Sequence, residues 1–414
     1  MKKIIVILSL VFIVSVAVLF SKGEEKDFKN YTNKNADKLS MMLETEAGTG
    51  NYEEVTRDAW PTEGYKLNTT LSKCENGGQI SWDNEKKIVI MNSDRSEKCF
   101  VYFDIYKDIT FATYIKGLYT GTQGDNNLYL HDDSLENGAN DGSYRYSGPS
   151  ETVNNFVCFG YDSKNGECPT DNLFRIIGVF DDNVKLIKYD YAKSTLLGTD
   201  GDYVSSYNEA AGSAGWGTSL GNNSREDIGA YYWNNSEGTS STNLWSKSRL
   251  NTINLNKNFL NNIGAFWTNK IISATWKVGG NDTGNILTQV FKTYVNEFSN
   301  PKYSKTYNAK VGLMYVSDYG YAAAPSAWKT NLSAYANTTI RSNNWLYMGL
   351  HEWSITPRTD ECDGYQCAYQ ISCDNSIGHR INVYSFAIRP VLYLNSSVNY
   401  VSGIGTSSNP YIIN

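Results

Sequence analysis

The residues best suited to molecular recognition lie between His351 and Phe386. This segment mixes tryptophan, tyrosine, histidine, arginine, asparagine and aspartate with three cysteines. Tyrosine and tryptophan offer large contact areas at low entropic cost, while arginine and asparagine make directed hydrogen bonds. Their irregular spacing fits neither a helix nor a strand, which predicts loops. In the alternative interpretation, Trp353 and the aliphatic residues are core and the rest is a solvated loop. The expected ligand-binding residues are Trp353, Arg358, Tyr365, Tyr369, Asn375, His379, Arg380 and Tyr384.

The last three cysteines of the segment raise the question of a metal site. Cys362, Cys367 and Cys373, followed by His379, have the ligand types of a three-cysteine, one-histidine zinc site. Structural zinc sites usually show tighter paired spacing, and an exported chain favours disulfides. We therefore expect one disulfide within this trio and one unpaired thiol. No metal and no cofactor is expected.

The other four cysteines form two pairs along the chain. Cys74 and Cys99 bracket one predicted module, and Cys158 and Cys168 lie close together in the next. In an exported chain, each pair is expected to be a disulfide. Closing a loop of about 25 residues, as between the first pair, should contribute roughly 3 kcal/mol.

Catalytic motifs are weak. The run Gly217 to Gly221, GTSLG, has the pattern of a nucleophile elbow, but neither an apolar strand nor a helix flanks it. His351 and Glu352 fail the metalloprotease pattern because Ile355 stands where the second histidine is needed. No phosphate loop or dinucleotide fingerprint occurs. We therefore expect no catalytic residues, and an enzyme is the alternative to a binding protein.

Composition excludes several classes of protein. The chain of 414 residues is 14% aromatic, with 31 Tyr and 10 Trp, and only 19% charged. This excludes a disordered chain, a coiled coil and a polytopic membrane protein. With 37 basic and 43 acidic residues, the net charge is -6 and no basic block is present, which argues against a nucleic-acid partner.

The N-terminus predicts export. Lys2 and Lys3 precede the apolar run Ile4 to Phe20, which is long for a signal-peptide core and at the lower limit for a membrane span. We favour an uncleaved anchor that leaves the remaining chain on the outer face of the cell membrane. A cleaved signal and a secreted protein remain the alternative.

Turn signals and hydrophobic periodicity divide the chain further. Ile109 to Thr120 and Leu244 to Ile271 have helical periodicity, and Asp181 to Asn183 is typical of a hairpin turn. Phe386 to Leu394 is expected to be a buried central strand in which Arg389 is paired or reaches the surface. The predicted parts are a signal anchor (1–23), a stalk (24–50), a small all-β module (51–108), a linker (109–143) and an α+β domain (144–414).

A family resemblance covers the chain from about Ser40 to the C-terminus. Its segments resemble uncharacterised exported proteins of gut Firmicutes, and the terminal part is similar to C-type-lectin-like domains, including those of formylglycine-generating enzymes. The resemblance implies a compact α+β domain whose loops form a binding face. The segments that carry it, in order, are KCENGG, SEKCFVYFD, YRYSGPSETVNNFVCFGYDSKNGECPTDNLFRIIGVF, VGLMYVSDYGYAAAPSAW, NNWLYMGLHEWSITPR, FAIRPVLYLN and VSGIGTSSNPYIIN.

Two functions follow as expectations. The first is a surface-displayed binding or adhesion protein that recognises an unknown glycan or protein ligand through aromatic and polar loops. The second is an exported enzyme on a formylglycine-generating-enzyme-like or hydrolase scaffold, although the cysteine pair that this chemistry requires cannot be matched to Cys362, Cys367 or Cys373. The oligomeric state is left open.

Overall fold

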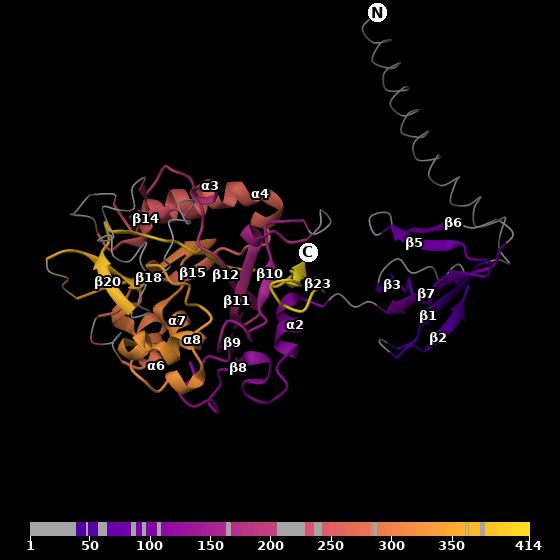
Figure 1. Cartoon of the computed structure of the whole chain (residues 1–414), viewed down its shortest axis with the longest axis horizontal. Helices are drawn as coiled ribbons and strands as arrows, with labels where there is room; N and C mark the ends of the chain where they lie inside the picture. Colours follow the sequence, from indigo (N-terminus) through magenta and orange to yellow (C-terminus); the bar gives the residue numbers. More distant parts are fainter. Residues whose placement is uncertain are drawn as a thin grey trace, which may run out of the picture. The chain divides into compact units, whose positions relative to one another are not determined.

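Figure 1 shows the computed structural model of the chain. It describes residues 39–46, 49–56, 64–83, 88–92, 97–105, 109–162, 167–204, 228–235, 242–282, 284, 288–360, 362, 364–372 and 377–414. The chain divides into two compact units, Met1–Asp108 and Ile109–Asn414. The predicted anchor, the Gly217 to Gly221 motif, Cys373 and Asn375 lie outside the described residues.

The first unit is a small sheet closed by a disulfide. β1 runs antiparallel to β2 and parallel to β7, while β3 and β4 pair with β7, and β5 and β6 form a separate hairpin. Along β7, alternate residues point inward, so that Val101 and Phe103 meet Met41 and Leu67 in the core. The strands are β1 (Leu39–Glu44), β2 (Tyr52–Val55), β3 (Tyr65–Leu67), β4 (Lys73–Cys74), β5 (Gln79–Asp83), β6 (Ile88–Asn92) and β7 (Cys99–Ile105).

The first unit begins earlier than the sequence predicts. Leu39 to Glu44, expected in a stalk with helical character, form the strand β1. A short segment with apolar residues at positions 39, 41, 42 and 43 satisfies both a helical and a strand period, and pairing with β7 decides the outcome. The disulfide between Cys74 and Cys99 joins directly opposed residues of β4 and β7.

A seven-stranded sheet forms the centre of the second unit. Its order is β17-β22-β12-β11-β9-β8, and β10 pairs with β11. The predicted hairpin is confirmed, since β11 and β12 are joined at Asp181 and Asp182. The strands are β8 (Leu128–Leu130), β9 (Tyr144–Tyr146), β10 (Phe156–Cys158), β11 (Leu173–Phe180), β12 (Asn183–Lys188), β17 (Val311–Gly312) and β22 (Val391–Tyr393).

The prediction for the last long apolar segment is confirmed in part. Residues 386–394 do not form one strand, because Phe386 ends the short strand β21 (Ser385–Phe386) and only Val391–Tyr393 form the central strand β22. β22 pairs on one side with β12 and on the other with β17, so it is not an edge strand. Val391 and Leu392 are fully buried. Arg389, just before the strand, is buried and paired with Glu352.

The described residues of the second unit also form four smaller sheets. They are β13-β14-β21, β15-β16, β18-β19-β20 and β23-β24. Their strands are β13 (Tyr203–Val204), β14 (Ala230–Tyr232), β15 (Ala274–Lys277), β16 (Thr306–Ala309), β18 (Glu352–Pro357), β19 (Cys367–Ile371), β20 (Ile377–Ile381), β21 (Ser385–Phe386), β23 (Tyr400–Ser402) and β24 (Ile412–Ile413).

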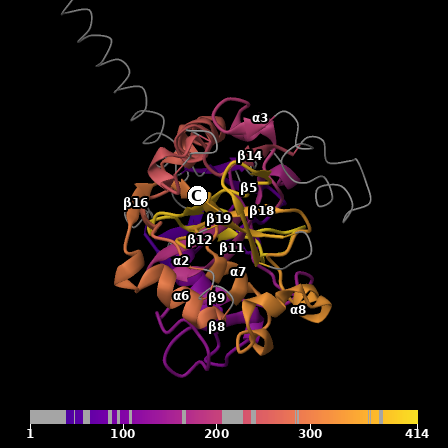
Figure 2. The same ribbon diagram turned by 90° about the vertical axis from the view of Figure 1, so that its left-hand side faces the viewer.

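Short helices pack around these sheets (Figures 1 and 2). The predicted helix after Ile109 is confirmed as α2, in which Thr110 caps the N-terminus and Phe111 and Ile115 face the core. The predicted helical segment 244–271 is also confirmed, as η7, η8 and α4. The helices are α2 (Phe111–Gly117), α3 (Ser194–Leu197), η8 (Leu250–Phe259), α4 (Leu260–Thr268), α6 (Val290–Phe298), α7 (Val316–Ala322) and α8 (Thr338–Ser342), and the short 3-10 turns are η3 (Asp125–Asn127), η5 (Thr170–Asn172), η7 (Trp245–Lys247), η9 (Pro301–Tyr303), η10 (Pro325–Ala327) and η11 (Leu332–Ala336).

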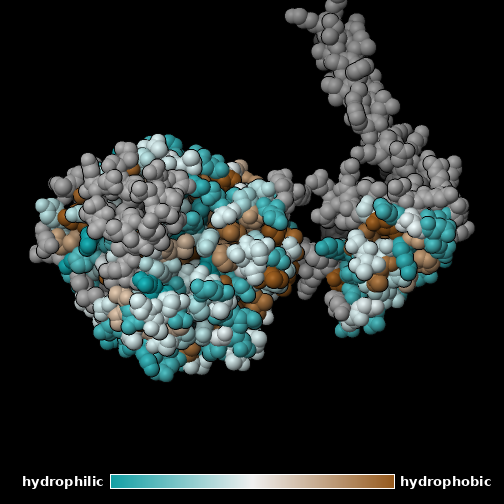
Figure 3. Space-filling model, in the orientation of Figure 1, coloured by the Kyte–Doolittle hydropathy of each residue, from teal (hydrophilic) through white to brown (hydrophobic). Residues whose placement is uncertain are grey.

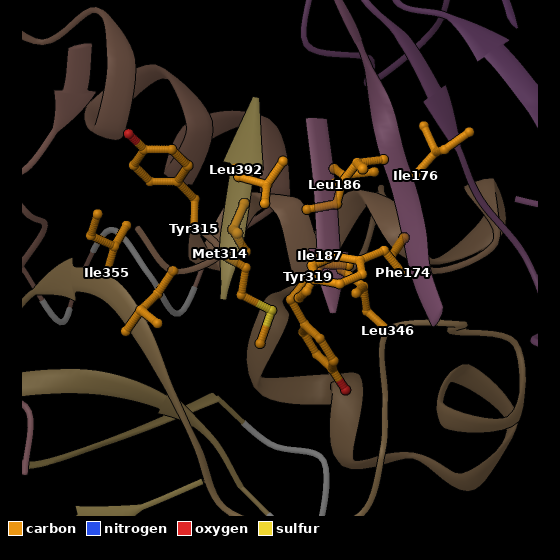
Figure 4. Packing of buried hydrophobic residues seen from close by; sticks show 14 of the residues in the cluster. Phe174, Ile176, Leu186, Ile187, Met314, Tyr315, Tyr319, Leu346, Ile355 and Leu392 are labelled. Atoms are coloured by element: carbon orange, nitrogen blue, oxygen red, sulfur yellow. The ribbon is translucent and has the colours of Figure 1, made fainter. Parts of the chain in front are cut away.

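One continuous core joins the central sheet to α7. Figure 4 shows Leu186 and Ile187 of β12 beside Leu392 of β22, with Met314 and Tyr319 reaching them from the chain around α7. Residues 109–143, expected to be a linker, belong to this unit: α2 contributes to the same core and β8 to the central sheet.

The predicted fold class was wrong. The second unit is rich in strands that are distributed over several small sheets, in place of one compact C-type-lectin-like α+β domain built on a small sheet. Glycine and asparagine interrupt the apolar runs, so that many strands have only two to five residues. In the part of the chain with assigned structure, no helix has the length and apolarity needed to cross a membrane.

Candidate functional site

The segment expected to form binding loops is a three-stranded antiparallel sheet. β19 lies between β18 and β20, with Pro357 opposite Ala368 and Tyr369 opposite His379. The prediction of loops between Trp353 and Tyr384 was therefore wrong for the three strands of this segment. Every residue of β18 and β19 is buried, so the two-residue alternation that marks a half-exposed strand is missing. α7 packs next to both strands (Figure 2).

Two of the expected contact residues belong to the core. Trp353 is completely buried, donates a hydrogen bond from Nε1 to the carbonyl of Tyr231 at 3.0 Å, and packs on Phe386 with ring centroids 4.5 Å apart. Tyr369 has only 1% of its surface exposed. Neither side chain can reach a ligand at the surface, so both assignments were wrong.

Tyr365 is the exposed aromatic residue of this segment. It is 44% exposed and lies on a loop closed by the disulfide between Cys362 and Cys367. Its backbone N–H donates to the carbonyl of Cys362 at 2.9 Å, which tightens the loop further. An exposed tyrosine on a constrained loop loses little conformational entropy on binding.

Four of the expected residues gather at the end of the sheet that carries this loop. The backbone N–H of Arg358 donates to the carbonyl of Cys367, which places the end of β18 beside the start of β19. Arg380 lies opposite Ala368, and Tyr384 follows the end of β20. We call this group, Arg358, Tyr365, Arg380 and Tyr384, the tyrosine rim.

The two arginines of the tyrosine rim differ in their hydrogen-bond partners. Arg358 donates from Nε and Nη2 to the carboxylate of Asp360 at 2.9 and 3.1 Å, so its guanidinium is fixed and partly neutralised. Arg380 is exposed and donates from Nη1 to the carbonyl of His379 at 2.9 Å. Tyr384 is half-buried and stacks on Phe386 at 6.5 Å. The rim thus offers two aromatic rings, one solvent-facing guanidinium and one anchored guanidinium.

His379 lies on β20 beside the rim. It is half-buried, and its ring is 6.3 Å from that of Tyr369 on the neighbouring strand. The zinc interpretation of this histidine loses support because Cys362 and Cys367 are joined to each other. Within the described ranges, no group of three or more histidine, cysteine, aspartate or glutamate residues is arranged to hold a metal ion.

One buried contact has the atoms of a nucleophile and a base. Ser372 Oγ lies 3.3 Å from His351 Nδ1, and both residues are largely buried, with 7% and 8% exposure. The carboxylate of the neighbouring Glu352 is engaged by Arg389 through two hydrogen bonds of 2.7 and 2.9 Å. The serine is thus largely buried, and the adjacent acid is held by Arg389.

The sequence interpretation missed a cluster of buried charges in the second unit. Lys185 Nζ lies 2.6 Å from Asp318 Oδ2, and their side chains are 0% and 2% exposed. Glu297 is 3% exposed, and burial raises its pKa to about 7. A lysine inside the apolar strand NVKLIK and an aspartate inside VSDYGYA were the available signals, because lone charges in apolar runs are rarely buried without a partner.

The chain was compared with family models, curated proteins and solved structures. No family model, no curated protein and no solved structure matches it. Its function therefore has to be argued from the rim and from the buried groups themselves.

Proposed function

We propose that this protein is an exported binding protein that recognises a glycan or protein ligand outside the cytoplasm through the tyrosine rim. The observation that carries the proposal is the exposure of Tyr365 on a disulfide-closed loop. Most tyrosines of the described sheet segment are packed, whereas this one presents its ring to solvent at 44% exposure. A tyrosine ring held on a constrained loop provides contact area for a partner at low entropic cost.

The chemistry of the rim supports recognition rather than catalysis. Tyr365 and Tyr384 supply flat apolar surfaces with hydroxyl groups at their edges, and Arg380 supplies donors. Flat rings beside hydrogen-bond donors suit the faces and hydroxyls of a sugar as well as a peptide backbone. On the face seen in Figure 3, hydrophobic residues of the second unit occur in small patches among polar ones, which is consistent with a localised contact.

The disulfides support an extracytoplasmic location. Three are present in the described part of the chain, Cys74–Cys99, Cys158–Cys168 and Cys362–Cys367. Disulfides persist in oxidising compartments and are rare in the cytosol of most organisms. The expected pairing of the first four cysteines agrees with this arrangement.

A binding test follows directly. The double variant Tyr365→Ala/Arg380→Ala should lose binding on a glycan array and on a panel of immobilised extracellular proteins, while its thermal unfolding stays close to that of the parent because both side chains are exposed. Phe266→Ala is the matched control, since Phe266 is 63% exposed on α4 and outside the rim. Full binding by the double variant, or an equal loss in the control, contradicts the proposal.

A further inference from the structure

The contact between Lys185 and Asp318 has the geometry of a reacting pair. Nζ and Oδ2 are 2.6 Å apart, and the residues are 133 positions apart in the chain. We propose that Lys185 and Asp318 condense to an intramolecular amide bond that links β12 to α7. The bond would join the central sheet covalently to the chain that packs on it.

The surroundings exclude water from the pair. Four aromatic rings surround Lys185 Nζ. Its distances to the ring centroids are 4.6 Å for Tyr315, 5.4 Å for Phe180, 5.4 Å for Tyr393 and 6.0 Å for Trp276. Burial lowers the pKa of Lys185, because a dry site disfavours the ammonium form. An uncharged amine is the nucleophilic form, and the aromatic enclosure around Lys185 favours it.

Rigid elements hold both reacting groups. Lys185 lies on β12 between β11 and β22, opposite Tyr393. Asp318 is fixed because its Oδ2 accepts a hydrogen bond from the backbone N–H of Tyr315 at 2.8 Å. Fixed contact between two groups replaces a bimolecular encounter and lowers the barrier to reaction.

Glu297 is the positioning residue of this site. Its carboxylate accepts hydrogen bonds from the backbone N–H groups of Val316 and Ser317 at 3.2 Å each, and from Thr356 Oγ1 at 2.6 Å. It therefore holds the two residues immediately before Asp318. With a pKa raised to about 7 by burial, it is also a neighbouring acid that exchanges a proton near neutral pH.

The reaction balances without a co-reactant. One proton passes from the ammonium group of Lys185 to the Asp318 carboxylate, the amine then attacks Cγ of Asp318, and the new C–N bond forms as one C–O bond breaks. The departing oxygen leaves as water with the proton of the carboxyl group and one proton of the amine. No oxidant, metal or nucleotide is consumed, and the dry site favours loss of the water.

Exposed lysine and aspartate pairs in the same unit provide internal controls. Lys116 and Asp182 lie 2.9 Å apart, as do Lys193 and Asp171, but their side chains are 31% to 78% exposed. Water has access to both partners there, so the dry surroundings that favour the condensation are missing. These pairs should stay as ion pairs.

Peptide mapping of the full chain decides the question. After reduction, alkylation and tryptic digestion, we expect the peptide 311–329, which contains Asp318, to be joined to a peptide that contains Lys185, with a mass lower than the sum by one water. Cleavage after Lys185 should be blocked, whereas cleavage after Lys116 and Lys193 should proceed. Free peptides with normal cleavage after Lys185 would overturn the proposal.

Substitutions separate bond formation from folding. Lys185→Met and Asp318→Ala should abolish the linked peptide, and Asp318→Asn should form it with loss of ammonia instead of water. Glu297→Gln should slow formation, so that freshly purified protein contains a larger unlinked fraction even where circular dichroism shows a native fold. Should a variant fail to fold, the unsubstituted chain alone still answers the question, because its linked peptide is either present or absent.

Discussion

At the scale of single residues, Arg389 and Glu352 form a buried ion pair in the second unit. Two hydrogen bonds of 2.7 and 2.9 Å join the guanidinium to the carboxylate, and a third of 2.7 Å runs from Nη2 to the carbonyl of Leu346. Both side chains are at most 2% exposed. Removing one partner leaves an uncompensated buried charge.

Glu352→Gln should therefore lower the free energy of unfolding by about 3 to 5 kcal/mol. Denaturant unfolding followed by tryptophan fluorescence measures the effect. The control is Lys116→Ala, which removes one partner of an exposed pair and should change stability by at most about 1 kcal/mol. Similar losses in the two variants would show that burial does not decide the strength of these pairs.

Glu297 makes stability depend on pH. Burial, its largest influence, raises its pKa from 4.5 to about 7, with Asp318 adding to the rise and the hydrogen bonds from Ser317 and Thr356 opposing it. Between these two values, the folded state holds a proton that the unfolded state has released. This group's contribution to stability is thus present below pH 4.5 and is lost as the pH rises to about 7.

Glu297→Gln should flatten that dependence. The difference in unfolding free energy between parent and variant isolates Glu297, because the neighbouring Asp318, Lys185 and Arg145 are common to both proteins. Urea unfolding at several pH values between 4.5 and 7.5 supplies the comparison. A difference that does not change with pH contradicts the raised pKa.

The type of a residue predicted its role only where that type has a single common role when it is buried. It misled where the same type occurs both in cores and in binding sites. Arg389 was correctly expected to be paired or at the surface, because an isolated buried guanidinium is too costly. Trp353 and Tyr369 were taken as contact residues because tryptophan and tyrosine serve both hot spots and cores. Only the register of β18, β19 and β20 distinguishes these roles, and it depends on contacts that are distant in sequence.

At the scale of elements, β17 shows how closely the central sheet is packed. A Cβ atom on Gly312 would lie 2.8 Å from the ring of Trp276, which also borders the Lys185 enclosure. Gly312→Ala should cost about 1 to 3 kcal/mol through overpacking. Gly117→Ala is the matched control, because a Cβ there meets no atom within 4 Å and lies in α2. Thermal unfolding of both variants tests this, and equal stability would contradict the packing argument.

Elements with local signals were predictable and elements without them were not. The helix α2 and the hairpin β11–β12 carry a cap, a turn and a clear period within a short stretch of chain. β1 pairs in parallel with β7, about 60 residues later, so its partner is invisible to a local pattern. The sheet β18-β19-β20 was missed for a different reason. Both faces of β18 and β19 are buried, so these strands lack the alternation of apolar and polar residues that marks a half-exposed strand.

At the scale of the whole molecule, the two units have separate cores. The core of the first unit consists of Met41, Leu67, Val101 and Phe103, and the main core of the second contains residues from Phe111 onward. We expect two unfolding transitions in calorimetry. The double variant Cys74→Ala/Cys99→Ala should lower the free energy of unfolding of the first unit by roughly 3 kcal/mol. The transition of the second unit should stay unchanged. A single transition that shifts as a whole would contradict independent units.

The overall architecture was the least predictable level. The N-terminal apolar run predicted export and the short apolar runs predicted several strands, but neither contained a signal for how the strands divide among sheets. Strand pairing in the second unit joins segments more than 200 residues apart, as between Lys185 and Tyr393. Such pairings depend on the balance of many packing contacts rather than on any local pattern.

The central place of β22 has a consequence for biosynthesis. This strand comes from the last part of the chain yet sits between β12 and β17, and the ring of Tyr114 near the start of the unit stacks on that of Tyr400 at 3.6 Å. A chain that leaves the ribosome N-terminus first cannot complete the sheet until Val391–Tyr393 have been made, so β12 keeps an open edge until then. If the chain is exported as we propose, the delay keeps it unfolded for passage through a translocation channel. It also means that a nascent chain stalled before Val391 should be held by chaperones or degraded.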